Sequence, residues 1–405
     1  MKKLLFSTLV LIVILTQFDD NLSEEATSLI ARVETKKTSD AFLYLHGIFA
    51  EEGEDPISVG IDVLEEYRNF DINESFTISE HPDSNKLTLP DGDEFCKTQE
   101  EGCLEYLFSE DISATDLLRQ HSTLVSRSNK FHGFNEYRTL SKPTVSEPVP
   151  PYQYITAAER IKVISAISLY KNGNASKSVE NLLVQFSTLR KSMELQDNLI
   201  GKLVFLSTLS EIIDVLSVIM ANAVVNIDVI PNLSKSEKSF YDIAAIEFVM
   251  MYYTFSDLDR DPEFFKAGGH IPRWLTRIVY KPNMTINAIL PIYERLEYLA
   301  TLSPSELATR LEETENHSPS SSKLRNYAGN TLMSIPPSFD KYVILFADFE
   351  AKIALFNQVH IFNSDLDNLE NPYYGPEKPI SSDGKLCFSG PFEDEESLRC
   401  LTMEI

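Results

Sequence analysis

The feature that most constrains the fold is a helical hydrophobic period that runs through most of residues 156–362. Apolar side chains recur there every three or four residues, which places them on one face of an α-helix. No helical hairpin repeats at a fixed spacing, so a solenoid is disfavoured. The sequence therefore predicts a mainly α protein, an irregular multi-helix bundle, with helices at 157–171, 176–193, 195–225, 235–255, 284–302 and 339–362.

The segment 195–225 is the most apolar stretch after the first eighteen residues. Its length alone would allow it to cross a bilayer. It carries Lys202, Glu211 and Asp214, and charged side chains are rare in membrane-spanning helices. We therefore expect a buried core helix.

Regions of different composition flank the predicted helical domain at 156–362. Residues 19–141 are acidic and mix short helices with loops, and Ser113 with Asp116 is placed to cap one of these helices. Four prolines in residues 142–151 predict an extended linker over 142–155. Residues 363–405 form a loop-rich tail, with one short strand expected at 385–388. In the acidic region, helices are expected at 24–39, 40–49, 58–70 and 113–135.

The first eighteen residues have the pattern of a signal peptide or a signal-anchor. Lys2 and Lys3 precede an apolar run over 4–15, and Asp19 follows shortly after it. Such a segment directs the rest of the chain across the membrane. The first pair of small residues suited to signal cleavage, Ala26 and Ser28, lies far downstream. An uncleaved inner-membrane anchor with a periplasmic domain is therefore favoured over a soluble periplasmic or secreted product.

The chain has an even number of cysteines, which suits an oxidising compartment. Pairing of sequence neighbours would close two short loops in turn-rich stretches, although the crossed pairings also satisfy the count. A zinc site made by all four thiolates is disfavoured, since the gaps within the pairs exceed the two to four residues typical of such sites. The disulfide candidates are Cys96, Cys103, Cys387 and Cys400.

The acidic composition limits the choice of partner. A net charge of −25 and a pI near 4.7 argue against nucleic acid, because phosphate backbones repel an acidic surface. They allow a basic protein partner, although an acidic surface also serves solubility alone. With 43% hydrophobic residues the chain has enough apolar surface for a folded core.

No established catalytic motif is present, so neither a cofactor nor a metal is expected. The sequence lacks a G-x-S-x-G elbow, an H-E-x-x-H helix and a P-loop. The acidic run 257–261 resembles a calcium loop, but Pro262 and Gly268 occupy the positions that require Gly and Glu. This run is therefore interpreted as a polar turn between helices.

One loop concentrates residues that commonly contact a ligand or a partner. It combines a Gly pair, a His, two Arg and the one Trp of the chain, and loops of this kind often carry function. A core position for the Trp is the alternative. The candidate residues are Gly268, Gly269, His270, Arg273, Trp274 and Arg277.

Two functions follow as hypotheses. The first is a bacterial envelope protein, held in the inner membrane by residues 1–18, whose periplasm-facing helical body binds a protein partner or acts as an assembly scaffold. The second is an exported hydrolase with a site assembled around the Gly268–Arg277 loop. The anchor, the helical core and the lack of a catalytic motif favour the first, so enzymatic activity is not the expectation.

Overall fold

The computed structural model describes residues 17–34, 38–69, 86–144, 147–258, 272–313, 319–322, 324–333, 339–382 and 384–403. Within these ranges the chain forms fifteen α-helices and five short β-strands, which confirms the predicted mainly α class. Residues 1–16 lie outside the described residues. The N-terminal membrane or signal helix therefore stays a prediction.

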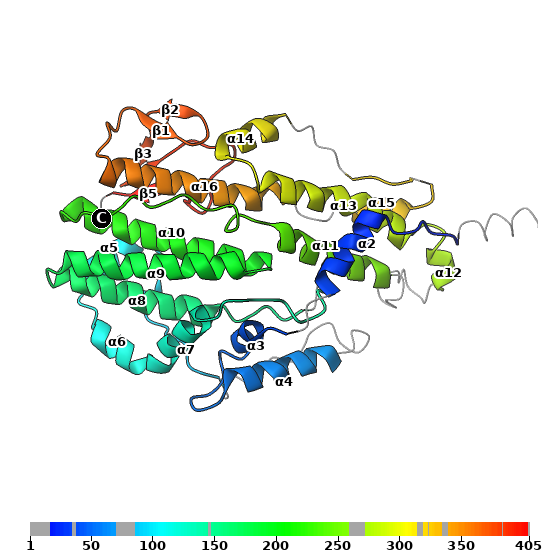
Figure 1. Ribbon diagram of the computed structural model, residues 1–405, viewed down its shortest axis with the longest axis horizontal. Helices are drawn as coiled ribbons and strands as arrows, with labels where there is room; N and C mark the ends of the chain where they lie inside the picture. The colour runs from blue at the N-terminus through cyan, green and yellow to red at the C-terminus, as the bar shows by residue number, and fades with distance from the viewer. Residues whose placement is uncertain are drawn as a thin grey trace, which may run out of the picture.

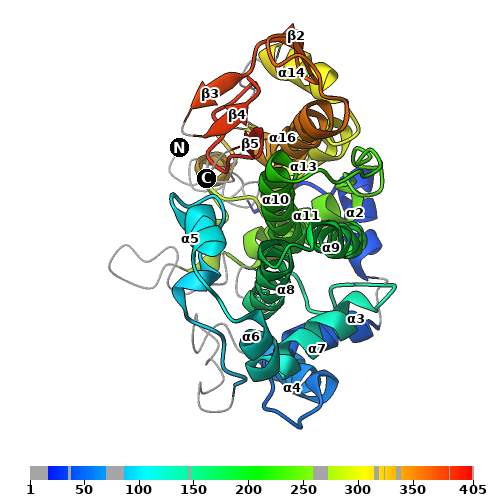
Figure 2. The ribbon, with the colours of Figure 1, turned by 90° about the vertical axis from the view of Figure 1, so that its left-hand side faces the viewer.

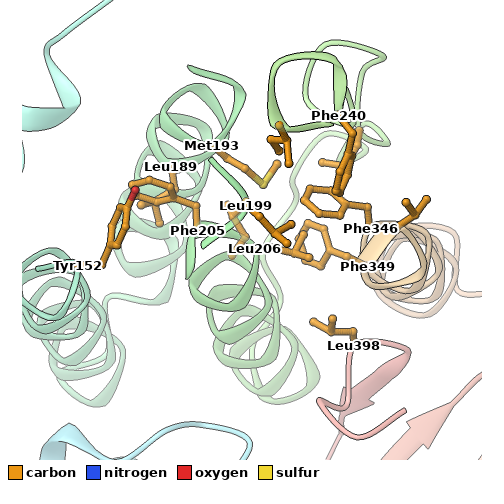
Figure 3. Packing of buried hydrophobic residues seen from close by; sticks show 14 of the residues in the cluster. Tyr152, Leu189, Met193, Leu199, Phe205, Leu206, Phe240, Phe346, Phe349 and Leu398 are labelled. Carbon is orange, nitrogen blue, oxygen red and sulfur yellow. The ribbon is translucent and has the colours of Figure 1, made fainter. Parts of the chain in front are cut away.

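Four long helices form the middle of the molecule and lie side by side in Figure 1. Helix α10 is their centre: Phe205 packs towards α8 and α9, with its ring 6.1 Å from that of Tyr152, while Leu206 faces Phe349 of α16 (Figure 3). Two sides of α10 are therefore covered by other helices. The four are α8 (Gln153–Lys171), α9 (Ala175–Leu195), α10 (Leu199–Asn222) and α16 (Asp340–Phe356).

Helix α10 is a core helix, as its charged residues predict. Among the described residues it alone is long and apolar enough to cross a membrane, yet 78% of its most apolar window is buried inside the protein. Its buried Lys202 donates hydrogen bonds to the carbonyls of Glu237, at 2.8 Å, and Ser239, at 2.7 Å. Desolvation by burial lowers the pKa of Lys202 to about 8. These partners compensate the buried ammonium group.

Most helices of a second group pack around α13 and α16, where α14 lies beside α16 (Figure 2). Helix α2 contacts α11 and α13, where Arg32 lies 2.7 Å from Glu297 and 3.6 Å above the ring of Tyr241. Helix α14 begins with a capping box made by Ser303 and Glu306. The group comprises α2 (Glu24–Glu34), α11 (Tyr241–Asp257), α12 (Arg273–Thr276), α13 (Pro282–Leu299), α14 (Pro304–Glu312) and α15 (Tyr327–Leu332).

Short helices form the remainder of the N-terminal region. The helix predicted at 113–135 is interrupted at His121, where the chain bends so that both pieces contact α8. The cap is as predicted, because the Ser113 hydroxyl accepts a hydrogen bond from the Asp116 amide at 3.4 Å. The elements are α3 (Asp40–His46), α4 (Pro56–Asn69), the 3₁₀ turn η2 (Asp93–Phe95), α5 (Cys103–Ser109), α6 (Ala114–Gln120) and α7 (Ser122–His132).

Two glycines allow α3 and α4 to touch through their backbones. A Cβ atom added to Gly60 would overlap the carbonyl of Leu43 in α3. One added to Gly47 would overlap the carbonyl of Pro56 in α4. Because no side chain fits at either position, the two helices approach at backbone distance.

The proline-rich segment crosses the surface between two helices. Tyr67 of α4 donates a hydrogen bond of 2.6 Å to the carbonyl of Lys142, whose ammonium group lies 3.8 Å from the ring centroid of Tyr253 in α11. Helix α8 then begins at Gln153, four residues before the predicted start. One hydrophobic cluster extends from Ala26 to Leu401 across all of these regions. The domain boundaries stay a prediction.

The tail folds into two small antiparallel sheets. The strand predicted at 385–388 is present as β4, and four further strands were not foreseen. Helix α16 ends at Phe356 and continues as one π-helical turn, η3 (Asn357–Ile361), which fills the predicted 339–362 segment. Strands β1 (Leu369–Asn371) and β2 (Gly375–Glu377) form one sheet; β3 (Ile380–Ser382), β4 (Lys385–Cys387) and β5 (Cys400–Thr402) form the other.

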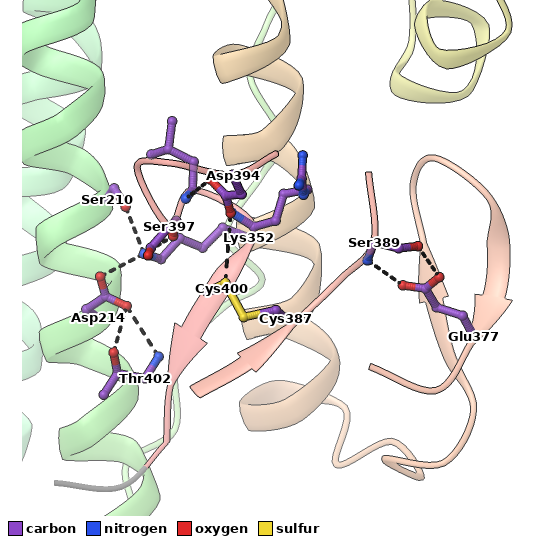
Figure 4. The surroundings of a disulfide bond; sticks show 12 residues. Ser210, Asp214, Lys352, Glu377, Cys387, Ser389, Asp394, Ser397, Cys400 and Thr402 are labelled. Atoms are coloured by element: carbon purple, nitrogen blue, oxygen red, sulfur yellow. Dashed lines mark hydrogen bonds and ion pairs between the residues drawn. A yellow bond between two sulfur atoms is a disulfide. The ribbon is translucent and has the colours of Figure 1, made fainter. Parts of the chain in front are cut away.

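The four cysteines form two disulfides between sequence neighbours. Cys96 pairs with Cys103, with 5.8 Å between their Cα atoms. Cys387 pairs with Cys400 directly across β4 and β5, with 4.1 Å between their Cα atoms (Figure 4). No free thiol is left for a zinc site.

A buried ion pair fixes the tail to the helices. The ammonium group of Lys352 in α16 lies 2.7 Å from Asp214 and 2.8 Å from the hydroxyl of Ser210, both in α10 (Figure 4). The other oxygen of Asp214 accepts hydrogen bonds from the amide and the hydroxyl of Thr402 in β5, both at 3.3 Å. The side chain of Lys352 is fully buried, so α10, α16 and the tail meet at a site that water does not reach.

A second buried pair reinforces the same junction. Arg399 lies 2.9 Å from Asp348, which also accepts a 2.6 Å hydrogen bond from Tyr373. Burial raises the pKa of Asp348 to about 6, although Arg399 opposes that rise. Two ion pairs thus lie within the protein interior where α10, α16 and the tail meet.

Candidate binding groove

The structure places only part of the predicted ligand loop. Gly268, Gly269 and His270 lie outside the described residues, as does most of the calcium-like run 257–261. Arg273 and Trp274 lie in α12, and Arg277 follows that helix. The guanidinium of Arg277 lies 3.7 Å from Asp19. Trp274 is 55% exposed, so the alternative of a core tryptophan is wrong.

Another cluster has the residue types of acid–base catalysis. His132 of α7 lies 2.7 Å from the hydroxyl of Ser192 through Nδ1 and 3.1 Å from Glu159 through Nε2. All three side chains are buried, so no substrate reaches the hydroxyl. We interpret the cluster as a hydrogen-bond network that joins α7, α8 and α9.

The carboxylate of Glu159 is well compensated within this network. Ser128 and Lys162 each bond to it at 2.6 Å, and Gln185 adds a bond of 2.8 Å. Burial alone would raise the pKa of Glu159, but the hydrogen bond from His132 and the charge of Lys162 hold it below the usual range. The group therefore stays ionised and serves as an anchor between helices.

No cluster of three or more His, Cys, Asp or Glu side chains suited to a metal ion occurs among the residues that the structure places. The candidate site is instead a groove between α9 and the chain that leaves α10. It measures about 1040 Å³ and is open to solvent. Apolar side chains form much of its surface: Val179, Leu183, Phe186, Val225, Ile227, Val229 and Ile230.

One wall of the groove is an extended segment, residues 224–229. Over residues 224–228 its side chains alternate: Val225 and Ile227 are half-buried, while Val224, Asn226 and Asp228 are exposed, and Val229 is exposed as well. The side chain of Val224 is 98% exposed. No backbone hydrogen bond joins these six residues to any other described part of the chain. Alternating exposure of this kind is typical of a β-strand, and the segment has no strand beside it among the described residues.

Side chains from two helices fix the end of this segment. Asn357 exchanges two hydrogen bonds with the backbone of Ile230, at 3.1 and 2.8 Å. Arg190 of α9 donates to the carbonyls of Pro231, at 2.6 Å, and Asn232, at 2.8 Å. The extended wall is thus held in place without any strand pairing.

The charges around the groove are mostly negative. Arg190 contacts Glu237 at both of its oxygens and neutralises it. Burial would raise the pKa of Glu237, but hydrogen bonds from Arg190 and Ser234 keep it below its usual value, so the pair is ionised. The lining contains four carboxylates, Glu180, Glu194, Asp228 and Glu237, and two cations, Arg190 and Lys191.

This groove was not foreseen from the sequence. The predicted helix at 195–225 includes Val224 and Val225, whereas α10 ends at Asn222. The signal was present, because Val224 to Val229 alternates apolar and polar residues after its first two valines. Comparisons of the chain with protein-family models, curated proteins and solved structures found no match. The function must therefore be inferred from the geometry of the chain itself.

Proposed function

We propose that this chain is an exported protein of the bacterial envelope whose helical body binds a protein partner. The groove along α9 would hold an extended segment of that partner as a strand beside residues 224–229. The observation that carries the proposal is the row of unpaired backbone groups along one wall of an apolar groove. Such a strand edge pairs readily with another chain, and β-strand addition is a common mode of peptide recognition.

The groove also favours a particular partner sequence. Alternate side chains of an added strand would point into the groove, where Leu183, Phe186 and Ile227 favour apolar residues. The remaining side chains would meet a rim that carries an excess of carboxylates. The partner segment is thus expected to alternate apolar residues with polar ones that include Lys or Arg.

Two observations support the export part of the proposal. Both disulfides suit an oxidising compartment. The leader pattern of residues 1–18 supports export independently. A fusion of alkaline phosphatase after residue 40 tests the topology, because the enzyme is active only after export. An inactive fusion would contradict the envelope assignment.

Selection of peptides from a random library on the full-length chain tests the groove. The selected peptides should show the alternating apolar and basic pattern, and Asn226→Pro should weaken their binding at least about tenfold, since proline removes a backbone donor. The matched control is Val184→Asn, on an exposed part of α9, which should bind the selected peptides as the original chain does. Proline is not used at Val184, because it would disrupt the helix.

Backbone methylation separates strand pairing from simple filling of the groove. A selected peptide N-methylated at the alternate amides that face residues 224–229 should lose binding. The same peptide methylated at the opposite set should retain it. If both methylated peptides bind equally, or if Asn226→Pro has no effect, the strand-addition proposal is wrong.

A further inference from the structure

Large apolar side chains are exposed together at the end of the molecule where the described chain begins. Tyr327 is 68% exposed, Phe18 63% and Leu324 93%. Soluble surfaces rarely gather such residues without a use. We call this set the α12 patch: Phe18, Trp274, Leu275, Val279, Leu324 and Tyr327.

Hydrogen bonds show that the α12 patch is continuous. Gln17 donates to the carbonyl of Trp274 at 2.9 Å, and Arg325 donates to the carbonyl of Phe18 at 3.1 Å. The amide of Ala328 in α15 donates to the carbonyl of Val279 at 3.0 Å. In Figure 1, α12, α15 and the start of the described chain lie at the same end of the molecule. The three segments therefore form one surface.

The position of this surface is set by the length of the chain. The apolar run of the leader ends at Leu15, and Gln17 is already bonded to α12. Two residues span at most about 7 Å. If the run enters a bilayer, α12 must therefore lie at the membrane surface.

The length of the leader strengthens this constraint. As a helix, the twelve residues 4–15 would extend about 18 Å, since each residue adds about 1.5 Å. The hydrocarbon core of a bilayer is about 30 Å thick. Such a mismatch draws the flanking residues towards the lipid, beginning with Phe18.

The chemistry of the surface also suits a membrane interface. Tryptophan and tyrosine favour the headgroup level, where a ring has one wet and one apolar side. The acidic groups nearby are offset, because Asp20 lies 3.2 Å from Arg325 and Asp19 lies 3.7 Å from Arg277. Both aspartates that the structure describes beside Phe18 are therefore paired with a cation.

We propose that the α12 patch rests on the lipid surface of the membrane that the leader enters, on the side that faces away from the cytoplasm. The patch would hold the body against the bilayer at a fixed orientation. This inference rests on the proposed membrane attachment by residues 1–18. It is independent of the groove along α9.

Trp274 is the one tryptophan of the chain, so its fluorescence reports on the patch directly. The full-length protein is inserted into vesicles of phosphatidylethanolamine and phosphatidylglycerol, and flotation establishes attachment. With brominated acyl chains in the vesicles, Trp274 emission should fall at least about twofold, because a ring at the interface meets the quencher. Dissolved acrylamide should quench Trp274 less in the vesicle-bound protein than in the same protein in buffer without vesicles or detergent.

A relocated tryptophan is the control. The double variant Trp274→Phe with Val224→Trp moves the ring to an exposed site just beyond the end of α10. That end of α10 lies at the tail, since Ser217 donates a hydrogen bond to the carbonyl of Thr402. Its emission should not respond to brominated lipid. Equal quenching of both proteins would overturn the proposal, as would attached protein whose Trp274 stays unquenched. If Trp274 is shielded from acrylamide but is not quenched by brominated lipid, the ring contacts protein rather than lipid, and this result would also overturn the proposal. Protein that fails to float would overturn the attachment itself, and the α12 patch proposal with it.

Discussion

Replacement of Lys352 by methionine should destabilise the protein strongly. The ammonium group is fully buried and bonds to Asp214 at 2.7 Å and to Ser210 at 2.8 Å. Methionine has a similar length but no charge, so it would leave the carboxylate of Asp214 in the interior with only the two 3.3 Å bonds from Thr402. Loss of one partner from a buried ion pair costs about 3–5 kcal/mol.

The assay is urea unfolding of the full-length chain with its disulfides intact. The expected decrease in the free energy of unfolding for Lys352→Met is about 4 kcal/mol. The matched control is Lys378→Met, since Lys378 forms an ion pair of 2.6 Å with Asp367 while both side chains are mostly exposed. Exposed pairs contribute about 0–1 kcal/mol, so this variant should unfold almost as the original chain does.

A double-mutant cycle tests whether the contact between Lys352 and Asp214 accounts for this loss of stability. Asp214→Asn alone should also be costly, because it leaves the ammonium group of Lys352 without its counter-charge. The double variant leaves no charge at the site, so its cost should be smaller than the sum of the two single costs by at least about 1 kcal/mol. Additive costs, or a loss below about 1 kcal/mol for Lys352→Met, would refute the ion pair as a main contributor to stability.

Three further outcomes are expected from the geometry. Burial raises the pKa of Glu247 to about 7, so the stability that its protonated form contributes is complete below pH 4.5 and is lost as the pH rises through 7. Glu247→Gln should remove about 3 kcal/mol of this pH-dependent decline in the free energy of unfolding, measured by urea unfolding at several pH values. An unchanged pH dependence would contradict this expectation. Replacing Cys387 and Cys400 together by serine should lower the free energy of unfolding by about 3 kcal/mol, the entropy of the loop that they close, and a loss below 1 kcal/mol would contradict this origin. Gly60→Ala should cost about 1–3 kcal/mol in thermal unfolding, because the methyl group overlaps the carbonyl of Leu43; unchanged stability would show that α3 and α4 can separate freely.

The long helices could be predicted because their signal is local. The apolar period and the Asn172-Gly173 stop define α8, which ends at Lys171 with Gly173 at a φ of +79°. The charges of α10 identified it as a core helix. Strands of three residues, such as β1 and β5, are too short to show an alternating pattern.

Contacts between residues that are distant in the sequence could not be predicted. Lys352 and Asp214 are 138 positions apart, and no local pattern joins them. The groove depends on α9 lying beside residues 224–229, and that neighbourhood arises only once the bundle is assembled. The sequence likewise left open whether Trp274 is buried or exposed, because residue type favours a buried tryptophan while its surroundings decide.

The junction at Thr402 has a consequence for biosynthesis. Asp214 and Lys352 leave the ribosome well before the strand that completes their surroundings, and the disulfide of that strand can close only after Cys400 has emerged. A polypeptide released early, before residue 394, would retain every long helix but would present a charged pair and the apolar flank of α16 to solvent. Strand β5 thus completes the junction, and chains that terminate before it should be the ones that proteases remove.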